Sequence, residues 1–429
     1  MKRPIVIVLL TLALVFVLAG IGAILFFTVS NSSLDIVNDA FNVSAASEET
    51  QTLEVDEPVT LKVINEQGDV TVIGADVDAI TVEVVKTGFG KTQNQAETAL
   101  SNIEYTLDQT GNTVNLVYKF PKPKRQVDEK VDFVVTVPFE TGVEVDAAFG
   151  ELNVSGIQGD VIVENNFGNI TIDKVDGKLD ANTSSGKIEA TSIKAGAKDI
   201  DIFSGFGRVT LEQVSGANIN VRSQSGNIEL ENVRATKEMY LSTDFGKLEF
   251  KTGSADTLEA KTNSGSIELA SVTVKGQLTI RDDFGDVTLE QVKAASYDVE
   301  SNSGSITIDG VKGLVKAHTG FGSIKVENAE DVTLDLDTNS GSIEFSGTLG
   351  EGPHTVHSDF GEIELNIPAD SALNIKMETQ FGKITSDIPI TVTLTGEIKD
   401  GQQSGTMNGG GAELKVDTNS GNIHIKILK

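Results

Sequence analysis

Few side chains in this sequence are of a type and spacing that could carry out chemistry. The chain of 429 residues has four histidines and no cysteine. His354 and His357 lie closest together, but an odd separation places them on opposite faces of a strand, which is a poor arrangement for binding one metal ion, and we expect both to be exposed. The absence of cysteine excludes a disulfide framework, a Cys-type zinc site, a cysteine nucleophile and a lipid attached to an N-terminal cysteine.

Carboxylates are abundant, since 63 Asp and Glu stand against 34 Lys and Arg for a net charge of −29. Two carboxyl groups about 5–10 Å apart can cleave a glycosidic bond, but abundance gives any one pair little weight. No Gly-x-Ser-x-Gly elbow, P-loop or zinc-protease motif is present. The acidic excess disfavours a nucleic-acid partner, which Lys and Arg would have to bind. The sequence therefore predicts no catalytic residue, no cofactor site and no metal site, and an enzyme is the least favoured class.

The strongest signal begins near residue 148 and is a repeat of about 18–21 residues, a period typical of solenoids. Each copy has a glycine, usually preceded by Phe or Ser and followed by short alternating apolar runs. Such units cannot bury an apolar face alone, but stacked copies form a continuous core. The pattern predicts a parallel β-solenoid of about 15 coils, over 141–429. Its corners would be Gly150, Gly168, Gly186, Gly207, Gly226, Gly246, Gly265, Gly285, Gly304, Gly322, Gly341, Gly361, Gly382 and Gly421.

The residue before the glycine alternates between Phe and Ser, so the exact repeat spans two glycine units while the two-strand pattern repeats with every glycine. We favour a coil of about 19 residues, because a full turn of a solenoid fits in that length. Counting by twos along the strand that ends at Phe245 places the ring on the buried face. This parity predicts a core ladder in which each ring spreads over the neighbouring serine. Its members would be Phe167, Phe206, Phe245, Phe284, Phe321 and Phe360.

The position before Phe or Ser is Asp in several Phe coils and Asn in several Ser coils, as in Asp244 and Asn263. Aspartates stacked about 4.8 Å apart would repel, and an intervening Asn lowers that penalty. A ladder of turn residues is the favoured interpretation. A row of cation sites is the alternative, although the calcium-binding Gly-Gly-x-Gly-x-Asp repeat is absent.

The segments before the repeat must anchor and start the solenoid. Residues 1–28 contain an uncharged apolar run, Pro4–Thr28, behind Lys2 and Arg3, which predicts a transmembrane signal-anchor with the rest of the chain outside the cytoplasm. A signal peptide cut after Ala19 or Ala23 would instead release a secreted protein. Residues 29–52 are expected to form a polar stalk. Residues 53–140 read as β-strands with one amphipathic helix at 95–107.

The Asp-Phe-Gly and Asn-Ser-Gly units, together with Phe133–Pro138, resemble the bacterial putative adhesin family of repeated β-strand proteins, a domain of unknown function. The resemblance covers roughly 53–429. It implies a right-handed parallel β-solenoid behind a membrane anchor or signal peptide, sometimes associated with cell-envelope stress systems. It supplies no catalytic residues.

These observations predict a non-catalytic, membrane-anchored interaction or structural protein of the cell envelope. Its partners would be the membrane, through the N-terminal helix, and envelope glycans or proteins. An accessory regulator or sensor of envelope stress is the alternative, and a carbohydrate-active β-helix enzyme is less favoured. The last strand, at 423–427, has no evident cap in the sequence. We expect either a preceding loop to cover it or the open solenoid end to associate with another copy.

Overall fold

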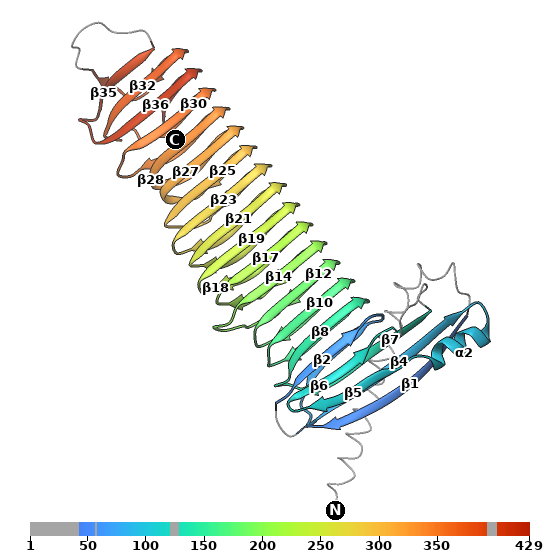
Figure 1. Ribbon diagram of the computed structural model, residues 1–429. Helices are drawn as coiled ribbons and strands as arrows, with labels where there is room; N and C mark the ends of the chain where they lie inside the picture. Colours follow the sequence, from blue (N-terminus) through green and yellow to red (C-terminus); the bar gives the residue numbers. More distant parts are fainter. Residues whose placement is uncertain (1–42, 56–57, 121–127, 393–400) are drawn as a thin grey trace, which may run out of the picture.

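The computed structural model describes residues 43–55, 58–120, 128–392 and 401–429, and it shows an all-β rod (Figure 1). The predicted anchor at 1–28 lies outside these ranges. Within them the single helix, α2 (Gln93–Ser101), is neither long nor apolar enough to cross a membrane.

Alternating apolar residues form the strands of the rod, with every second side chain buried. Strands of successive repeats pair in parallel, as Val161–Val163 of β10 do with Leu179–Ala181 of β12. One coil therefore corresponds to one glycine repeat and not to the doubled Phe–Ser unit, as predicted, and the solenoid is confirmed. The buried Val, Ile and Leu side chains form one continuous core along the axis.

The long strands of the coils form one parallel ladder. In spatial order it contains β2 (Thr60–Asn65), β8 (Gly142–Phe149), β10 (Val161–Phe167), β12 (Leu179–Ser185), β14 (Ile200–Phe206), β17 (Ile219–Ser225), β19 (Glu238–Phe245), β21 (Thr257–Ser264), β23 (Gln277–Phe284), β25 (Ser296–Ser303), β27 (Lys312–Phe321), β28 (Ile324–Ser340), β30 (His354–Phe360), β36 (Ala412–Ser420) and β32 (Leu373–Phe381).

A second parallel ladder follows the glycine corner. In spatial order it contains β3 (Val70–Ala75), β9 (Leu152–Ile157), β11 (Ile170–Val175), β13 (Ile188–Thr191), β15 (Val209–Glu212), β18 (Ile228–Ala235), β20 (Leu248–Ala255), β22 (Ile267–Val274), β24 (Val287–Glu290), β26 (Ile306–Asp309), β28, β29 (Ile343–Leu349), β31 (Ile363–Ile367), β37 (Ile423–Ile427) and β33 (Ile384–Ser386). The short β16 (Ser215–Gly216) pairs with β18.

A second corner interrupts or ends the strands of this second ladder, where one residue takes a left-handed conformation. The φ angles there lie between 50° and 60°, and Asn and Gln recur among these residues: Lys174, Ser192, Gln213, Asn232, Thr252, Ser271, Gln291 and Asn328. A single such residue turns the chain sharply, and the next residue is buried at most of these corners, as Val233 is.

The lead segment differs from the prediction at two points. Residues 43–54, assigned mostly to the stalk, form β1 (Val43–Glu54), which pairs antiparallel with β4 (Ala79–Gly90). The helix expected at 95–107 spans 93–101, because Thr92 caps its first turn and the chain then enters β5 (Tyr105–Thr110). β5 forms a hairpin with β6 (Thr113–Tyr118), and this pairing overrides the apolar stripe that continues to Leu107.

The lead segment is also continuous with the rod. β2 pairs with both β6 and β8, while β3 pairs with β7 (Glu129–Pro138) and β9. The lead strands therefore extend the two ladders, and β1, β4 and α2 project beside them (Figure 1).

The last strands of the chain do not lie at the end of the rod. β36 pairs in parallel with β30 on one side and β32 on the other, and β37 lies likewise between β31 and β33. The expectation of an open edge at 423–427 is therefore wrong. The terminal coil is the one that contains β32, and β35 (Gln402–Met407) pairs antiparallel with β32 and with β34 (Ile390–Thr391). A preceding segment thus provides the cap, as one of the two alternatives predicted, while association through this end stays a prediction.

Candidate functional site

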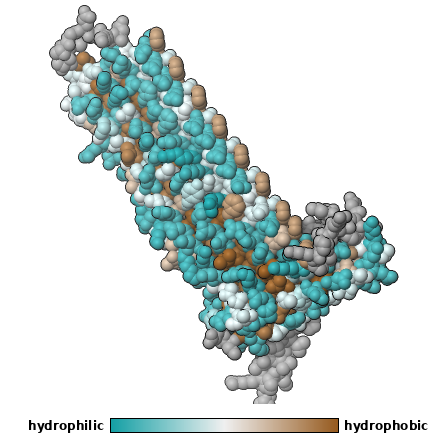
Figure 2. All heavy atoms as spheres, in the orientation of Figure 1, coloured by the Kyte–Doolittle hydropathy of each residue, from teal (hydrophilic) through white to brown (hydrophobic). Residues whose placement is uncertain are grey.

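Eight phenylalanines form one exposed row along an edge of the rod, which we call the phenylalanine row (Figure 2). Their exposed fractions run from 43% to 75%, and the members are Phe149, Phe167, Phe206, Phe245, Phe284, Phe321, Phe360 and Phe381. The predicted buried ladder is therefore wrong for all six of its residues, Phe167, Phe206, Phe245, Phe284, Phe321 and Phe360. Sequence parity fails at the last residue of the strand, since Thr243 is buried while Phe245, two residues on and beside the glycine corner, is 63% exposed.

The inside of that corner is already filled. Thr243, two residues before Phe245, is buried, and its Oγ1 donates a hydrogen bond to the carbonyl oxygen of Gly226, 2.9 Å away in the neighbouring coil. The backbones of the stacked glycines also approach closely, since a Cβ on Gly246 would lie 2.3 Å from that carbonyl oxygen. No room remains for a ring, so the ring points to solvent.

The glycines predicted as corners all lie in this column, and close backbone approach requires them there. At Gly265 the φ angle is +147°, and a Cβ would meet the Gly246 carbonyl oxygen at 2.0 Å. Both the space and the backbone conformation exclude other side chains. The column continues into the lead segment at Gly68, which the sequence repeat did not reveal because Gln67 replaces Phe or Ser.

The alternation of Phe with Ser is more regular in space than in sequence. Phe360 and Phe381 follow one another as repeat residues along the chain, and Ser420 comes last. Because β36 lies between β30 and β32, Ser420 pairs with Phe360 on one side and Phe381 on the other. The folded order of Phe, Ser, Phe keeps a serine between two rings up to the end of the rod.

This alternation sets the spacing of the rings. Parallel strands lie about 4.8 Å apart, so rings in every second coil are about 9.6 Å apart. One pair of adjacent coils carries two rings, Phe149 and Phe167, and these stack with centroids 5.1 Å apart and planes 7° apart. Elsewhere a serine separates the rings and leaves the space between them open.

A polar column runs beside the row. Asn263 donates to Asp244 over 3.2 Å, Asn302 to Asp283 over 2.6 Å, and Asn419 to Asp359 over 2.5 Å. Each Asn thus donates to the Asp of a neighbouring coil, as the ladder interpretation predicts, and Asn263 lies between two aspartates, Asp244 and Asp283. Among the residues that the structure describes, no group of three or more His, Asp or Glu is placed to bind a metal ion.

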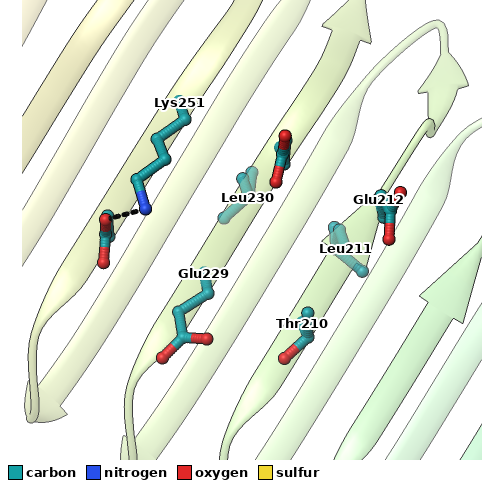
Figure 3. Close-up of a pocket in the computed structure, with 8 residues that line it drawn as sticks. Thr210, Leu211, Glu212, Glu229, Leu230 and Lys251 are labelled. Carbon is teal, nitrogen blue, oxygen red and sulfur yellow. Dashed lines mark ion pairs between the residues drawn. The ribbon is translucent and has the colours of Figure 1, made fainter.

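Charged side chains line a shallow depression on the outer face of the second ladder, between β15, β18 and β20 (Figure 3). Its volume is about 120 Å³, and Lys251 lies across it in an ion pair with Glu249. Pockets for small molecules usually enclose about 300–1,000 Å³. The depression is too small and too open to hold a sugar ring away from water.

Most coils bury a Ser or Thr hydroxyl two residues before the Phe or Ser of the glycine corner. One coil has a buried carboxyl at this position instead. Asp282 is 4% exposed at the position where most other coils have Ser or Thr, and its Oδ1 accepts a hydrogen bond of 3.1 Å from the Phe284 backbone N–H. Burial raises the pKa of Asp282 to about 7, and the nearby carboxylates of Asp283 and Asp286 act in the same direction.

His354 and His357 lie on opposite faces of β30, as expected, but only His357 is accessible to solvent. His354 is fully buried, its Nδ1 accepts from the Leu334 backbone N–H, and its Nε2 lies 3.2 Å from the Gly350 carbonyl oxygen. Burial lowers the pKa of His354. The exposure predicted for it is wrong, and His357 instead faces outward toward Asp417.

Comparison with known proteins identifies one family. The sequence model of the family described as Toastrack DUF4097 matches residues 60–312 and 250–426. No curated protein matches the chain.

Three solved structures are similar to the chain. A putative cell adhesion protein of Clostridium sporogenes is 8% identical, with 89% of this chain and 100% of that one covered and a TM-score of 0.18. A putative adhesin of Bacteroides fragilis is 14% identical, with coverage of 70% and 96% and a TM-score of 0.28. A putative adhesin of Parabacteroides merdae is 14% identical, with coverage of 69% and 95% and a TM-score of 0.25. At scores this low the three structures carry no argument about function.

Proposed function

The chain belongs to the Toastrack DUF4097 family, and from this premise we propose that it is a non-catalytic, membrane-anchored interaction protein of the cell envelope. The apolar run at 4–28 supplies the anchor, and the solenoid extends outside the cytoplasm. The phenylalanine row is the surface that contacts the partner.

The exposure of the row is the observation that carries this proposal. Single exposed apolar residues are common, but an aligned series on an otherwise polar surface is typical of an interaction site. The rings contribute nothing to the core, because buried Val, Leu and Ile side chains fill it. Their regular placement therefore needs a reason outside the fold, and contact with a partner provides one.

The rod is suited to contact and offers little for catalysis. Its corners and strands repeat with no long loops between Gly150 and Gly361, and active sites on such scaffolds usually need loops that enclose a cleft. The depression beside Lys251 is occupied by an ion pair. A stacked core also holds the rings at fixed separations, which preorganises them for a long partner.

Photo-crosslinking in living cells tests this proposal. Benzoylphenylalanine is placed at Phe284 in the row or, as a control, at Phe203, which is half-buried on the outer face of β14. We expect adducts of discrete mass from position 284 and none from position 203. Equal crosslinking at both positions, or none at 284, would contradict the proposal.

A further inference from the structure

We propose that the partner of the phenylalanine row is a second copy of this chain, whose rings insert over the serines between the rings of the first. This inference rests on the proposed function, since it names the partner of that same surface. The serines that provide the spaces are Ser185, Ser225, Ser264, Ser303, Ser340 and Ser420.

The chain itself contains an example of the contact. Where two neighbouring coils both carry a ring, Phe149 and Phe167 stack in parallel at 5.1 Å. Between rings about 9.6 Å apart there is space for one further ring at about 4.8 Å from each. A ring inserted from outside would therefore reproduce a spacing that the fold already contains.

The repeat distance favours a second copy over other partners. A partner must present apolar groups about 9.6 Å apart along the whole row to reach each space. A second rod has this repeat because its sequence is the same. A shift of one coil along the axis places its rings opposite the serines of the first copy. The insertion of β36, which puts Ser420 between Phe360 and Phe381, keeps the same repeat to the end of the rod.

The exposed area is large enough for a stable contact. The seven rings from Phe167 to Phe381 are 52–75% exposed. With roughly 200 Å² for a whole Phe, they offer on the order of 900 Å², close to the roughly 800 Å² per partner of a standard interface.

The charge of the chain opposes this contact and gives it a recognisable salt dependence. Two copies each carry a net charge of −29, and Asp244, Asp283 and Asp359 lie directly beside the row. Raising the salt concentration from about 0.1 M to 1 M shortens the screening length from about 10 Å to about 3 Å. Association should therefore strengthen with salt, whereas a contact based on opposite charges would weaken.

Sedimentation velocity of the full-length chain in detergent tests the inference. We expect a reversible dimer. In the variant F245S/F284S/F321S the dissociation constant should rise at least about 100-fold, because rings at the centre of an interface carry much of its affinity. The matched control is the substitution of three outward threonines of the strand faces, T279S/T288S/T307S, which should leave the dissociation constant unchanged.

A second variant distinguishes insertion of the rings from nonspecific hydrophobic association. S264F/S303F fills two spaces with the chain's own rings, as Phe149 and Phe167 already do, and so preserves the fold while adding apolar surface. Insertion predicts weaker association. Stronger association of this variant, or a wild-type chain that remains monomeric at high concentration and high salt, would overturn the inference. A monomer that still gives discrete adducts of another mass at position 284 would overturn only the second copy and leave the proposed contact surface in place.

Discussion

Replacing Asp282 by threonine is expected to stabilise the rod most strongly at alkaline pH. The carboxyl is buried and its pKa rises from 3.8 to about 7 on folding. The folded state thus holds this proton more tightly than the unfolded chain does. The stability that this group contributes is complete below pH 4 and is lost as the pH rises through 7.

The size of the effect follows from the shift. Between pH 5 and pH 7 the folded state keeps a proton that the unfolded state has released, which corresponds to about 2–3 kcal/mol of stability lost, at about 1.4 kcal/mol for each pH unit. In D282T a hydroxyl can donate to the Gly265 carbonyl oxygen of the neighbouring coil, as Thr243 donates to the carbonyl oxygen of Gly226. The advantage of the variant over the wild type should therefore grow by about 2–3 kcal/mol from pH 5 to pH 8.

Urea unfolding of both proteins at pH 5 and pH 8, followed by circular dichroism, measures this difference. Comparison at each pH cancels the titration of the groups that the two chains share. D244N is the matched control, since Asp244 is half-buried at the position that corresponds to Asp283 two coils away, and its difference from the wild type should not grow with pH. An advantage of D282T that is independent of pH, or that shrinks at pH 8, would refute the reasoning.

Three further predictions concern the corner, the row and the end of the rod. G265A should lower the stability to urea by several kcal/mol, because its Cβ would lie 2.0 Å from a backbone oxygen, whereas G111A, with nothing within 4 Å, should cost only about 1 kcal/mol; equal losses would show that close approach is not the cause. F245S should change stability by less than about 1 kcal/mol while F250A, which empties a fully buried site, costs about 3–5 kcal/mol, and a comparable loss for F245S would mean that the ring supports the fold. Amide hydrogen exchange in β37 should be as slow as in the central coils, because both of its edges are paired; fast exchange would indicate a frayed terminus and contradict the inserted order.

The sequence predicted the solenoid well because its evidence is local and repeated. Glycines at a nearly fixed period and strands with every second residue apolar determine a coil that is one repeat long, whichever copy is considered. The same evidence led to the wrong prediction that the phenylalanine rings are buried. The alternation of buried and exposed side chains ends at Thr243, and Phe245, the last residue of β19 beside the glycine corner, lies on the outside.

The order of the last coils could not be predicted from local patterns. Nothing near Ser420 shows that β36 inserts before β32, since that choice depends on pairing with strands that are distant in the sequence. The sequence does carry one signal of the inserted order. From Phe167 onward the alternation of Phe and Ser breaks only where Phe381 follows Phe360, and exchanging the coils of Phe381 and Ser420 restores it.

The exposed positions of the rings give the alternation of Phe and Ser a different role from the one that the sequence suggested. The sequence suggested that serines relieve crowding inside a narrow corner. In the structure the rings lie outside, where adjacent rings would cover each other as Phe149 and Phe167 do. The serines therefore keep both faces of each ring open, which is useful only if something else occupies the spaces.

Thiol labelling in the native envelope tests the central claim most directly, namely that the phenylalanine row is the contact surface. Because the chain has no cysteine, S264C reports on a space in the row and S271C on the exposed second corner of the same coil. With a membrane-impermeant maleimide, we expect S264C to be labelled at least about 10-fold more slowly than S271C, since a partner that excludes water also excludes the reagent. This protection should disappear when F245S and F284S are added. Equal labelling rates for S264C and S271C in the unaltered row would contradict the account.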